Sequence, residues 1–248
     1  MHLILVADIH LADSPKESFG VDTISNFERV LAQVEKTQPD HVVMMGDYSL
    51  KTPKKQDVQL AFDRLEALGI PYSFIAGNHD RSVDLAEVVA GGKGLTDGEF
   101  YYKRAFGDRL ALFLDTAKGV MSKTQLSWVR QELEQNKQEA LIFMHHPPIA
   151  MGVAFMDENH AFQDPNRDVF DVLFSGLNPL NVFAGHYHTA RSTEVGMHSV
   201  HLCPSTYFQL VPAERAFAVS HTMPGLRHVE LLDDQIRTWI EFLAPRKG

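Results

Sequence analysis

The segment Leu3-Ile4-Leu5-Val6-Ala7-Asp8-Ile9-His10 decides the fold of this chain. Its apolar run is short and uninterrupted, which predicts a strand buried on both faces, as in the parallel sheets of α/β proteins. An aspartate and a histidine stand where that strand ends. In open α/β sheets, ligands bind outside the carboxyl ends of the strands. The segment therefore predicts both a central strand and one part of a functional site.

The same arrangement recurs four more times along the chain, each time with a metal-type side chain directly after an apolar run. The five strand-end groups are Asp8-Ile9-His10, Gly46-Asp47, Gly77-Asn78-His79-Asp80, His145-His146-Pro147 and Gly185-His186-Tyr187-His188. Each group alone has an ordinary explanation, such as a turn or an incidental surface histidine. Parallel strands would bring all five to one edge, and the glycines allow close approach of the backbone there. Together they predict one metal site.

The rest of the chain alternates between helical and extended patterns. Apolar residues at helical spacing predict helices over residues 24–34, 60–68, 122–133 and 169–174. Other apolar runs predict strands over residues 42–45, 72–76, 100–102, 110–114, 141–144 and 181–184, followed by short antiparallel strands over 199–202, 216–219, 229–232 and 236–242. Segments 91–98 and 151–167 are expected to be irregular. This order indicates an α/β fold of two packed sheets flanked by helices.

Composition limits the classes of function. A chain of 248 residues can bury roughly 70–75% of its unfolded surface, and without a linker or repeat we expect one domain over residues 1–248. The net charge of -9 and the lack of a basic stripe argue against duplex nucleic acid as a partner. The single cysteine, Cys203, excludes an intrachain disulfide and is expected to pack in the core. No signal peptide or membrane-length apolar run is recognised, so we expect a cytoplasmic protein without membrane contact.

The donor types indicate which metals the site would take. Carboxylates, imidazoles and one amide carbonyl suit Mn, Fe, Zn or Co, and the absence of thiolate disfavours a structural zinc site. Seven such donors exceed the needs of one tetrahedral ion, and they suit two ions about 3.5–4 Å apart with a shared carboxylate. We therefore expect two divalent or trivalent metal ions as cofactors.

In this order, the groups resemble the D-x-H, G-D, G-N-H-[D/E], H and G-H-x-H motifs of the calcineurin-like metallophosphoesterases, over Asp8 to His188. The resemblance implies a four-layer α/β/β/α sandwich of two mixed sheets flanked by helices. It also implies a first metal held by Asp8, His10 and His188, a second held by Asn78, His145 and His186, and a bridging Asp47. His145 is preferred to His146 because the family's ligand histidine commonly stands two residues before a proline, here Pro147.

Two neighbouring residues receive catalytic roles from the same resemblance. His79 would be a histidine outside the metal shell that stabilises the transition state or protonates the leaving oxygen. Asp80 would orient His79, as carboxylates often do for histidines.

Three further stretches resemble the class III cyclic-nucleotide phosphodiesterase branch, which is close to the glycerophosphodiesterase branch. They are Met144–Pro148, Gly152–Asp157 and Pro204–Gln209. Residues Phe155, Met156 and Phe162 either contact the substrate or pack a cap over the site, and His146 and His160 are second-choice substrate contacts. After Asp47, many relatives continue with a leucine and an acidic residue, whereas this chain has Tyr48–Lys51. That departure concerns substrate specificity rather than metal binding.

The function expected from these features is hydrolysis of a small-molecule phosphodiester. The substrate would be a cyclic nucleotide, such as 3',5'-cyclic AMP, or a glycerol-type diester. Two cations would neutralise the phosphoryl oxygens and lower the pKa of a bridging water from 15.7 towards about 7, so that hydroxide attacks. A phosphomonoesterase or pyrophosphatase of the same superfamily is one alternative, and a non-catalytic metal-binding scaffold is another. The late strands offer an edge through which copies of the chain can pair into a homo-oligomer.

Overall fold

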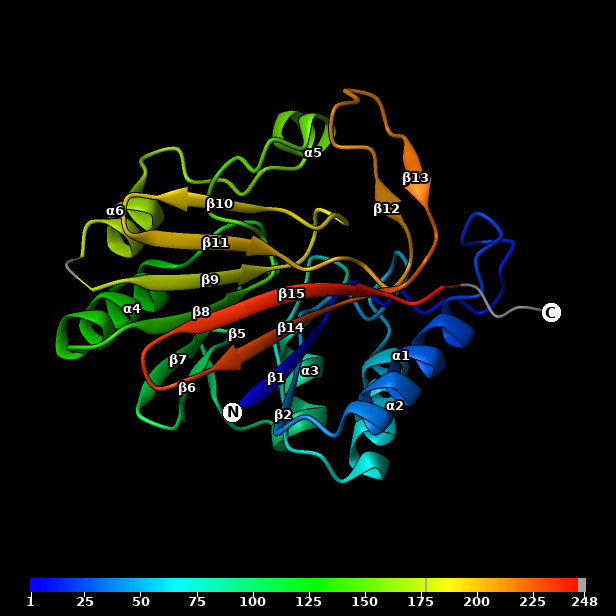
Figure 1. Ribbon diagram of the computed structural model, residues 1–248, viewed down its shortest axis with the longest axis horizontal. Coiled ribbons are helices and arrows are strands. Elements are labelled where there is room, and N and C mark those ends of the chain that lie inside the picture. The colour runs from blue at the N-terminus through cyan, green and yellow to red at the C-terminus, as the bar shows by residue number, and fades with distance from the viewer. Residues whose placement is uncertain (177, 245–248) are drawn as a thin grey trace.

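The computed structural model describes residues 1–176 and 178–244 and has two packed β-sheets with helices on their outer faces (Figure 1). The first sheet has five strands in the order β15 (Ile236–Phe242), β14 (Gly225–Leu231), β1 (His2–Val6), β2 (His41–Met44) and β3 (Tyr72–Phe74). The second has six, in the order β10 (Ser192–Val195), β11 (His198–Leu202), β9 (Leu180–Ala184), β8 (Ala140–Met144), β7 (Arg109–Phe113) and β6 (Tyr102–Phe106). Short pairs stand outside both sheets: β4 (Leu95–Thr96) with β5 (Glu99–Phe100), and β12 (Gln209–Leu210) with β13 (Val219–His221).

Both sheets combine parallel and antiparallel strands. Strands β1, β2 and β3 run parallel, and β14 and β15 complete their sheet in antiparallel pairs. In the second sheet β7, β8, β9 and β11 run parallel, while β6 and β10 are antiparallel edges. The prediction that the strands after residue 185 are antiparallel is therefore wrong for β11, which places Ser199 beside Asn181 of β9.

Helices cover the outer face of each sheet. They are α1 (Thr23–Thr37), α2 (Lys55–Leu68), α3 (Ser82–Ala90), α4 (Lys123–Gln135), α5 (Ala154–Asn159) and α6 (Asp168–Phe174). Residues of α1, α2 and α3 share one hydrophobic cluster with the first sheet, and residues of α4, α5 and α6 share another with the second. Figure 1 shows α1 and α2 on one side of the molecule and α4 and α6 on the other. No helix in the described part of the chain has both the length and the apolar character needed to cross a membrane.

Alternation along the central strands explains why they are apolar throughout. In β1, Ile4 and Val6 pack with the helices, whereas Leu3 and Leu5 belong to the cluster between the sheets. Strand β8 follows the same rule, because Phe143 joins the cluster between the sheets. Successive side chains of a strand point to opposite faces, so a strand covered on both faces is mostly apolar. The three clusters separate four layers, and the expected α/β/β/α sandwich is confirmed.

Local sequence signals predicted the start of α4 and the end of α2, but two helices were missed. The Ser122 side chain caps α4 by accepting a hydrogen bond from the Gln125 N–H, and α2 ends at Gly69 in the left-handed conformation. Helix α3 was not predicted, and α5 lies in the segment expected to be irregular. Helix α5 has only six residues, and the Asp157 carboxylate anchors its start by accepting from the N–H groups of Met151 and Val153, both at 2.9 Å. Periodicity over one and a half turns is too short to reveal such a helix.

Phe143 provides a test of the core between the sheets. It is fully buried and stacks between Phe113 and Phe183, with ring centroids 4.8 and 5.5 Å apart. We expect Phe143→Ala to lower the free energy of unfolding by about 3–5 kcal/mol, because the sheets cannot collapse into the cavity. Urea denaturation measures this loss. Ile24→Ala, at an exposed position of α1, should change stability by about 0.5 kcal/mol or less, and equal losses in both variants would contradict this account of the core.

Candidate metal centre

The loops that follow β1, β2, β3, β8 and β9 meet at one end of the two sheets. They carry the seven predicted metal ligands, which are Asp8, His10, Asp47, Asn78, His145, His186 and His188. The parallel strands of the first sheet and those of the second point their carboxyl ends to this place. The five strand ends therefore come from two sheets rather than from the edge of one.

The first group of donors consists of Asp8, His10 and His188. The Nε2 atoms of His10 and His188 are 3.1 Å apart, and the His188 Nε2 is 3.6 Å from the Asp8 Oδ1. All three side chains are almost completely buried. One carboxylate and two imidazoles thus surround a single point.

The second group surrounds the Nε2 of His145. This atom lies 3.1 Å from the Asn78 Oδ1 and 3.3 Å from the Asp47 Oδ2, and a nitrogen of His186 lies within the same cluster. The same Asp47 Oδ2 is 3.6 Å from the His10 Nε2 of the first group. One carboxylate oxygen therefore lies between the two groups of donors.

Backbone carbonyls fix which nitrogen of three histidines faces the centre. The Nδ1 of His10 lies 3.1 Å from the Ser49 oxygen, the Nδ1 of His145 lies 2.8 Å from the Met45 oxygen, and the Nε2 of His186 lies 3.0 Å from the His160 oxygen. A carbonyl only accepts, so these nitrogens carry protons and donate. When the ring is neutral, its opposite nitrogen presents a lone pair to the centre, as in metal-binding histidines. No side-chain motif marks these carbonyls, so they could not be predicted from the sequence.

The pKa shifts of the donor side chains also favour the binding of a cation. Burial, reinforced by the charge of Asp47 and opposed by His145, raises the pKa of Asp8 to about 8. Burial lowers the pKa of His10 to about 4 and that of His186 to about 3, which keeps both rings in the neutral form that binds metals. Burial opposes the charge of His145, but Asp47 and Asp8 outweigh it and raise its pKa to about 9. Binding of a metal ion would displace that proton and relieve the crowded carboxylates.

The backbone of the centre is strained at most of the predicted ligands. Positive φ angles occur at Asp8 (55°), His10 (42°), Asp47 (58°), His186 (64°) and His188 (45°). Such conformations cost about 1–3 kcal/mol each in residues other than glycine, and they cluster at functional sites. Tight packing holds them, because a Cβ atom at Gly77 would lie 2.2 Å from the Asp47 Oδ1. Only glycine fits beside this carboxylate.

The structure separates the roles expected for His79 and Asp80. The Nδ1 of His79 donates to the Lys51 carbonyl at 3.0 Å, and the ring packs edge-on against His10. The buried Asp80 carboxylate accepts backbone hydrogen bonds from Asp47 (2.7 Å), Tyr48 (2.9 Å) and Gly77 (2.8 Å). These contacts do not match the expectation that Asp80 orients the His79 ring. Asp80 instead joins the loops after β2 and β3, because one carboxylate can satisfy several N–H groups.

A cavity of about 260 Å³ opens from the donors to the solvent. Its lining includes His79, and also Phe155, Met156 and His160, for which substrate contact was one of the expectations from the sequence. His146 does not line it: this ring is buried, its Nδ1 lies 3.1 Å from the Thr116 Oγ1, and it packs 4.2 Å from the His186 ring. Phe162 lies beside His146 rather than in the lining. Four further aromatic residues line it: Tyr207 and Phe208, from the Pro204–Gln209 stretch, and Phe19 and Phe217, which no sequence motif had indicated.

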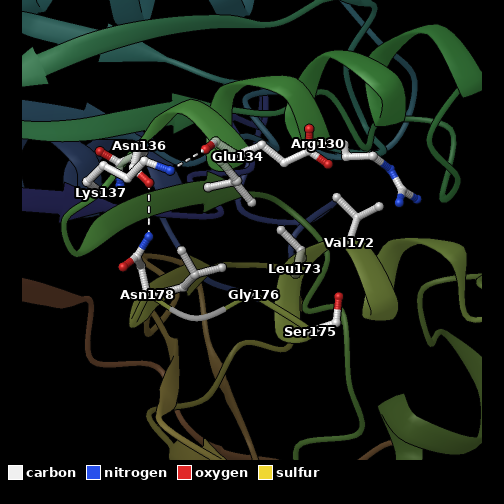
Figure 2. A pocket seen from close by; sticks show the side chains of 11 residues that line it. Arg130, Glu134, Asn136, Lys137, Val172, Leu173, Ser175, Gly176 and Asn178 are labelled. Carbon is white, nitrogen blue, oxygen red and sulfur yellow. Dashed lines mark hydrogen bonds between the residues drawn. The ribbon is translucent and has the colours of Figure 1, made fainter.

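A second pocket, of about 330 Å³, lies between α4 and α6 (Figure 2). Its charged side chains, Arg130, Glu134 and Lys137, are exposed to solvent. Its lining residues include none of the predicted metal or catalytic residues. The concentration of buried donors therefore favours the metal centre as the functional site.

Comparison with a family model identifies the sequence pattern independently. The model described as calcineurin-like phosphoesterase matches residues 1–190, which contain all five strand-end groups. A 3',5'-cyclic-nucleotide phosphodiesterase of Nostoc sp. is 28% identical, over 94% of this chain and 88% of that protein. The 3',5'-cyclic adenosine monophosphate phosphodiesterase CpdA of Pseudomonas aeruginosa is 27% identical, over 94% of this chain and 86% of that protein. The glycerophosphodiester phosphodiesterase GpdQ of Enterobacter lignolyticus is 26% identical, over 85% and 79%.

A solved structure shares the fold at low sequence identity. A dimetal phosphatase from Danio rerio has a TM-score of 0.71 and 15% identity, and the match covers 96% of this chain and 95% of that one. At this level of identity, the likeness concerns the arrangement of the sheets and helices alone.

Replacing Asp47 tests the shared carboxylate. We expect Asp47→Asn to weaken the binding of both metal ions, on the order of 100-fold or more, because even partners outside the metal shell contribute 10–100-fold. Calorimetric titration of chelator-treated protein with Mn²⁺ measures the affinity and the number of ions bound. Asp63→Asn, at an exposed position on α2, is the control and should bind like the unaltered protein. Unchanged binding of two ions by Asp47→Asn would refute the role of this oxygen.

Proposed function

The chain belongs to the calcineurin-like phosphoesterase family, and on that premise we propose that it is a metal-dependent phosphodiesterase acting on a cyclic nucleotide, such as 3',5'-cyclic AMP, or on a small linear diester. The observation that carries the proposal is the position of the Asp47 Oδ2, between a group around His10 and a group around His145. A carboxylate shared in this way suits a dinuclear centre. The relatives named for cyclic-nucleotide and glycerophosphodiester hydrolysis support the substrate class.

We assign the metals to the two groups of donors. The residues that would hold them are Asp8, His10 and His188 for one ion, Asn78, His145 and His186 for the other, and Asp47 for both. When bound, two ions would supply positive charge to the phosphoryl oxygens and a Lewis acid for an attacking water. Oxygen and nitrogen donors of this kind admit Mn, Fe, Zn or Co.

We infer that His79 donates the proton to the leaving group. Its Nδ1 donates to the Lys51 carbonyl, which leaves the Nε2 as the nitrogen available to a substrate. The side chain is only half-buried and lines the cavity beside Asn78. A protonated His79 can therefore give its Nε2 proton to the oxygen that departs from phosphorus. The Lys51 carbonyl keeps the ring in this orientation.

A substrate comparison tests the proposed function. With added Mn²⁺, we expect the protein to hydrolyse bis(p-nitrophenyl) phosphate and cyclic AMP, and to act more slowly on the monoester p-nitrophenyl phosphate. Chelation should abolish all hydrolysis, and Mn²⁺ should restore it, because the donors alone cannot neutralise an anionic diester. Release of nitrophenolate and of AMP measures the rates. No hydrolysis of any diester with Mn, Fe, Zn or Co would overturn the proposal.

His79→Ala tests the proton donor. We expect kcat for cyclic AMP to fall by about 10²–10⁴, because its alkoxide leaving group needs a proton. The loss on bis(p-nitrophenyl) phosphate should be much smaller, since nitrophenolate is a weak base that departs without one. Metal content, measured on the same protein, serves as the control and should not change. Equal losses on the two substrates would show that His79 acts in some other way.

A further inference from the structure

The outer wall of the catalytic cavity is built from aromatic rings that come from distant parts of the chain. The inner part is lined by the metal-type donors His10, Asp47, Asn78, His186 and His188. The rest of the lining includes Phe19, Phe155, Tyr207, Phe208 and Phe217, of which Phe19 and Phe217 are exposed. We propose that Phe19 and Phe217 form a stacking platform for a planar base, and that the natural substrate is therefore a nucleotide diester rather than a glycerol-type diester. This inference rests on the proposed function and deepens it.

The two outermost rings are exposed, although the chain has an aromatic cluster to bury them in. Phe19 is 74% exposed and Phe217 is 45% exposed, whereas Tyr207 and Phe208 behind them are buried. An exposed phenyl ring forgoes the burial that stabilises most aromatic residues, so its position calls for an explanation. Binding of a flat apolar ligand at the mouth of the cavity supplies one.

Both rings stand on a fixed backbone. Phe19 has a φ of 51°, a left-handed conformation that non-glycine residues rarely adopt. Its turn is held by the buried Ser18, whose Oγ donates to the Val21 oxygen at 2.6 Å, and by the Gly20 N–H, which donates to the Pro15 oxygen at 2.8 Å. The ring is thus held out towards the cavity mouth by a hydrogen-bonded turn rather than by a loose loop.

The segment that carries Phe217 is tied to α5. The Ala154 N–H donates to the Pro212 oxygen at 2.9 Å, and the Phe155 N–H donates to the Glu214 oxygen at 3.2 Å. Figure 1 shows α5 beside the β12–β13 hairpin at the same end of the molecule. The rings of Phe155 and Phe217 meet edge to face at 5.8 Å. A platform prepared in this way loses little conformational entropy when a ligand binds.

The rings form a continuous path from the metal donors to the platform. The His10 ring is 5.5 Å from Tyr207, and Tyr207 is 6.4 Å from Phe19 in a nearly parallel arrangement, with 15° between the ring planes. Phe217 is 5.7 Å from Phe19 and meets Phe208 at right angles, 5.5 Å away. Two ring-to-ring steps thus connect the metal donor His10 with the platform, inside one cavity.

The chemistry of this wall favours a base over a glycerol group. A base has a π face that stacks on phenyl rings, and stacking of this kind tolerates every base. A glycerol group needs hydrogen-bond partners for its hydroxyls. The four phenylalanine rings of the wall offer none, and the hydroxyl of Tyr207 is buried. The exposed Lys51 and Glu17 are the charged residues of the lining outside the donors. The platform would contact the face of a base and not the hydrogen-bonding groups on its edge. We therefore expect similar specificity constants for cyclic AMP and cyclic GMP, within about tenfold.

The test compares the double variant Phe19→Ala/Phe217→Ala with the unaltered protein on two diesters. Loss of a stacking partner corresponds to roughly a 5- to 150-fold effect per base, so we expect the KM for cyclic AMP to rise by about 10- to 100-fold. The KM for glycerophosphoglycerol, which has no aromatic group, should change by less than about twofold. Phe19→Leu/Phe217→Leu keeps the apolar surface and should recover little of the loss. Phe242→Ala, a partly exposed phenylalanine on β15, is the matched control.

Binding of adenosine to chelator-treated protein provides a readout independent of catalysis. Saturation-transfer NMR should detect adenosine on the unaltered protein and on Phe242→Ala, but not on the double alanine variant. Adenosine binding without hydrolysis of any diester would support the platform and sink the proposed function. Hydrolysis in which both diesters respond equally to the double variant, or absence of adenosine binding to the unaltered protein, would overturn the platform. Far-ultraviolet circular dichroism of each variant verifies that these surface changes leave the fold intact.

Discussion

The burial of three neighbouring carboxylates is the constraint on which the rest of this structure depends. Asp8, Asp47 and Asp80 are almost inaccessible to solvent, and each lies directly after a strand of the first sheet or in the adjoining loop. Burying like charges together is costly unless cations or hydrogen bonds compensate them. Asp80 is compensated by three backbone N–H groups. Asp8 and Asp47 accept fewer such bonds, from the His186 N–H (3.1 Å) and the His79 N–H (2.8 Å) respectively, and they also face imidazole nitrogens. A metal centre is the further compensation that suits them best.

The fold positions these charges by joining two sheets at one end. A single sheet would place the donors in a row, whereas two packed sheets place the ends of β1 and β2 opposite those of β8 and β9. The core between the sheets, with Phe113, Phe143 and Phe183 in a stack, sets their separation. Strained φ angles at the donors are tolerated because this core and the Asp80 hydrogen bonds hold the loops in one conformation. The packing of the layers therefore stabilises the strained backbone of the site.

Around this rigid centre the chain builds a cavity wall of a different character. The donors come from strand ends. The aromatic rings come from a turn before α1, from α5, from the residues just before β12 and from the segment joining β12 to β13. Loops supported by a fixed scaffold commonly carry specificity, because they can vary without disturbing the core. The metal-type residues are therefore suited to the chemistry common to phosphodiesters, and the aromatic wall is suited to choosing among them.

The sequence by itself determined the layers and the order of the donors, because apolar runs and the residues that end them are local patterns. Strand β1 and its Asp8, and α4 with its Ser122 cap, could be predicted in this way. Only the tertiary structure showed which distant parts of the chain meet in space. Examples are the parallel pairing of β11 with β9 and the contribution of donors by two sheets. The backbone carbonyls that orient His10, His145 and His79 are another example. It also showed that the Asp80 carboxylate accepts hydrogen bonds from backbone N–H groups and that the rings of Phe19 and Phe217 are in contact. Hydrogen bonds to backbone carbonyls, and contacts between rings nearly two hundred residues apart, produce no periodic pattern in the sequence.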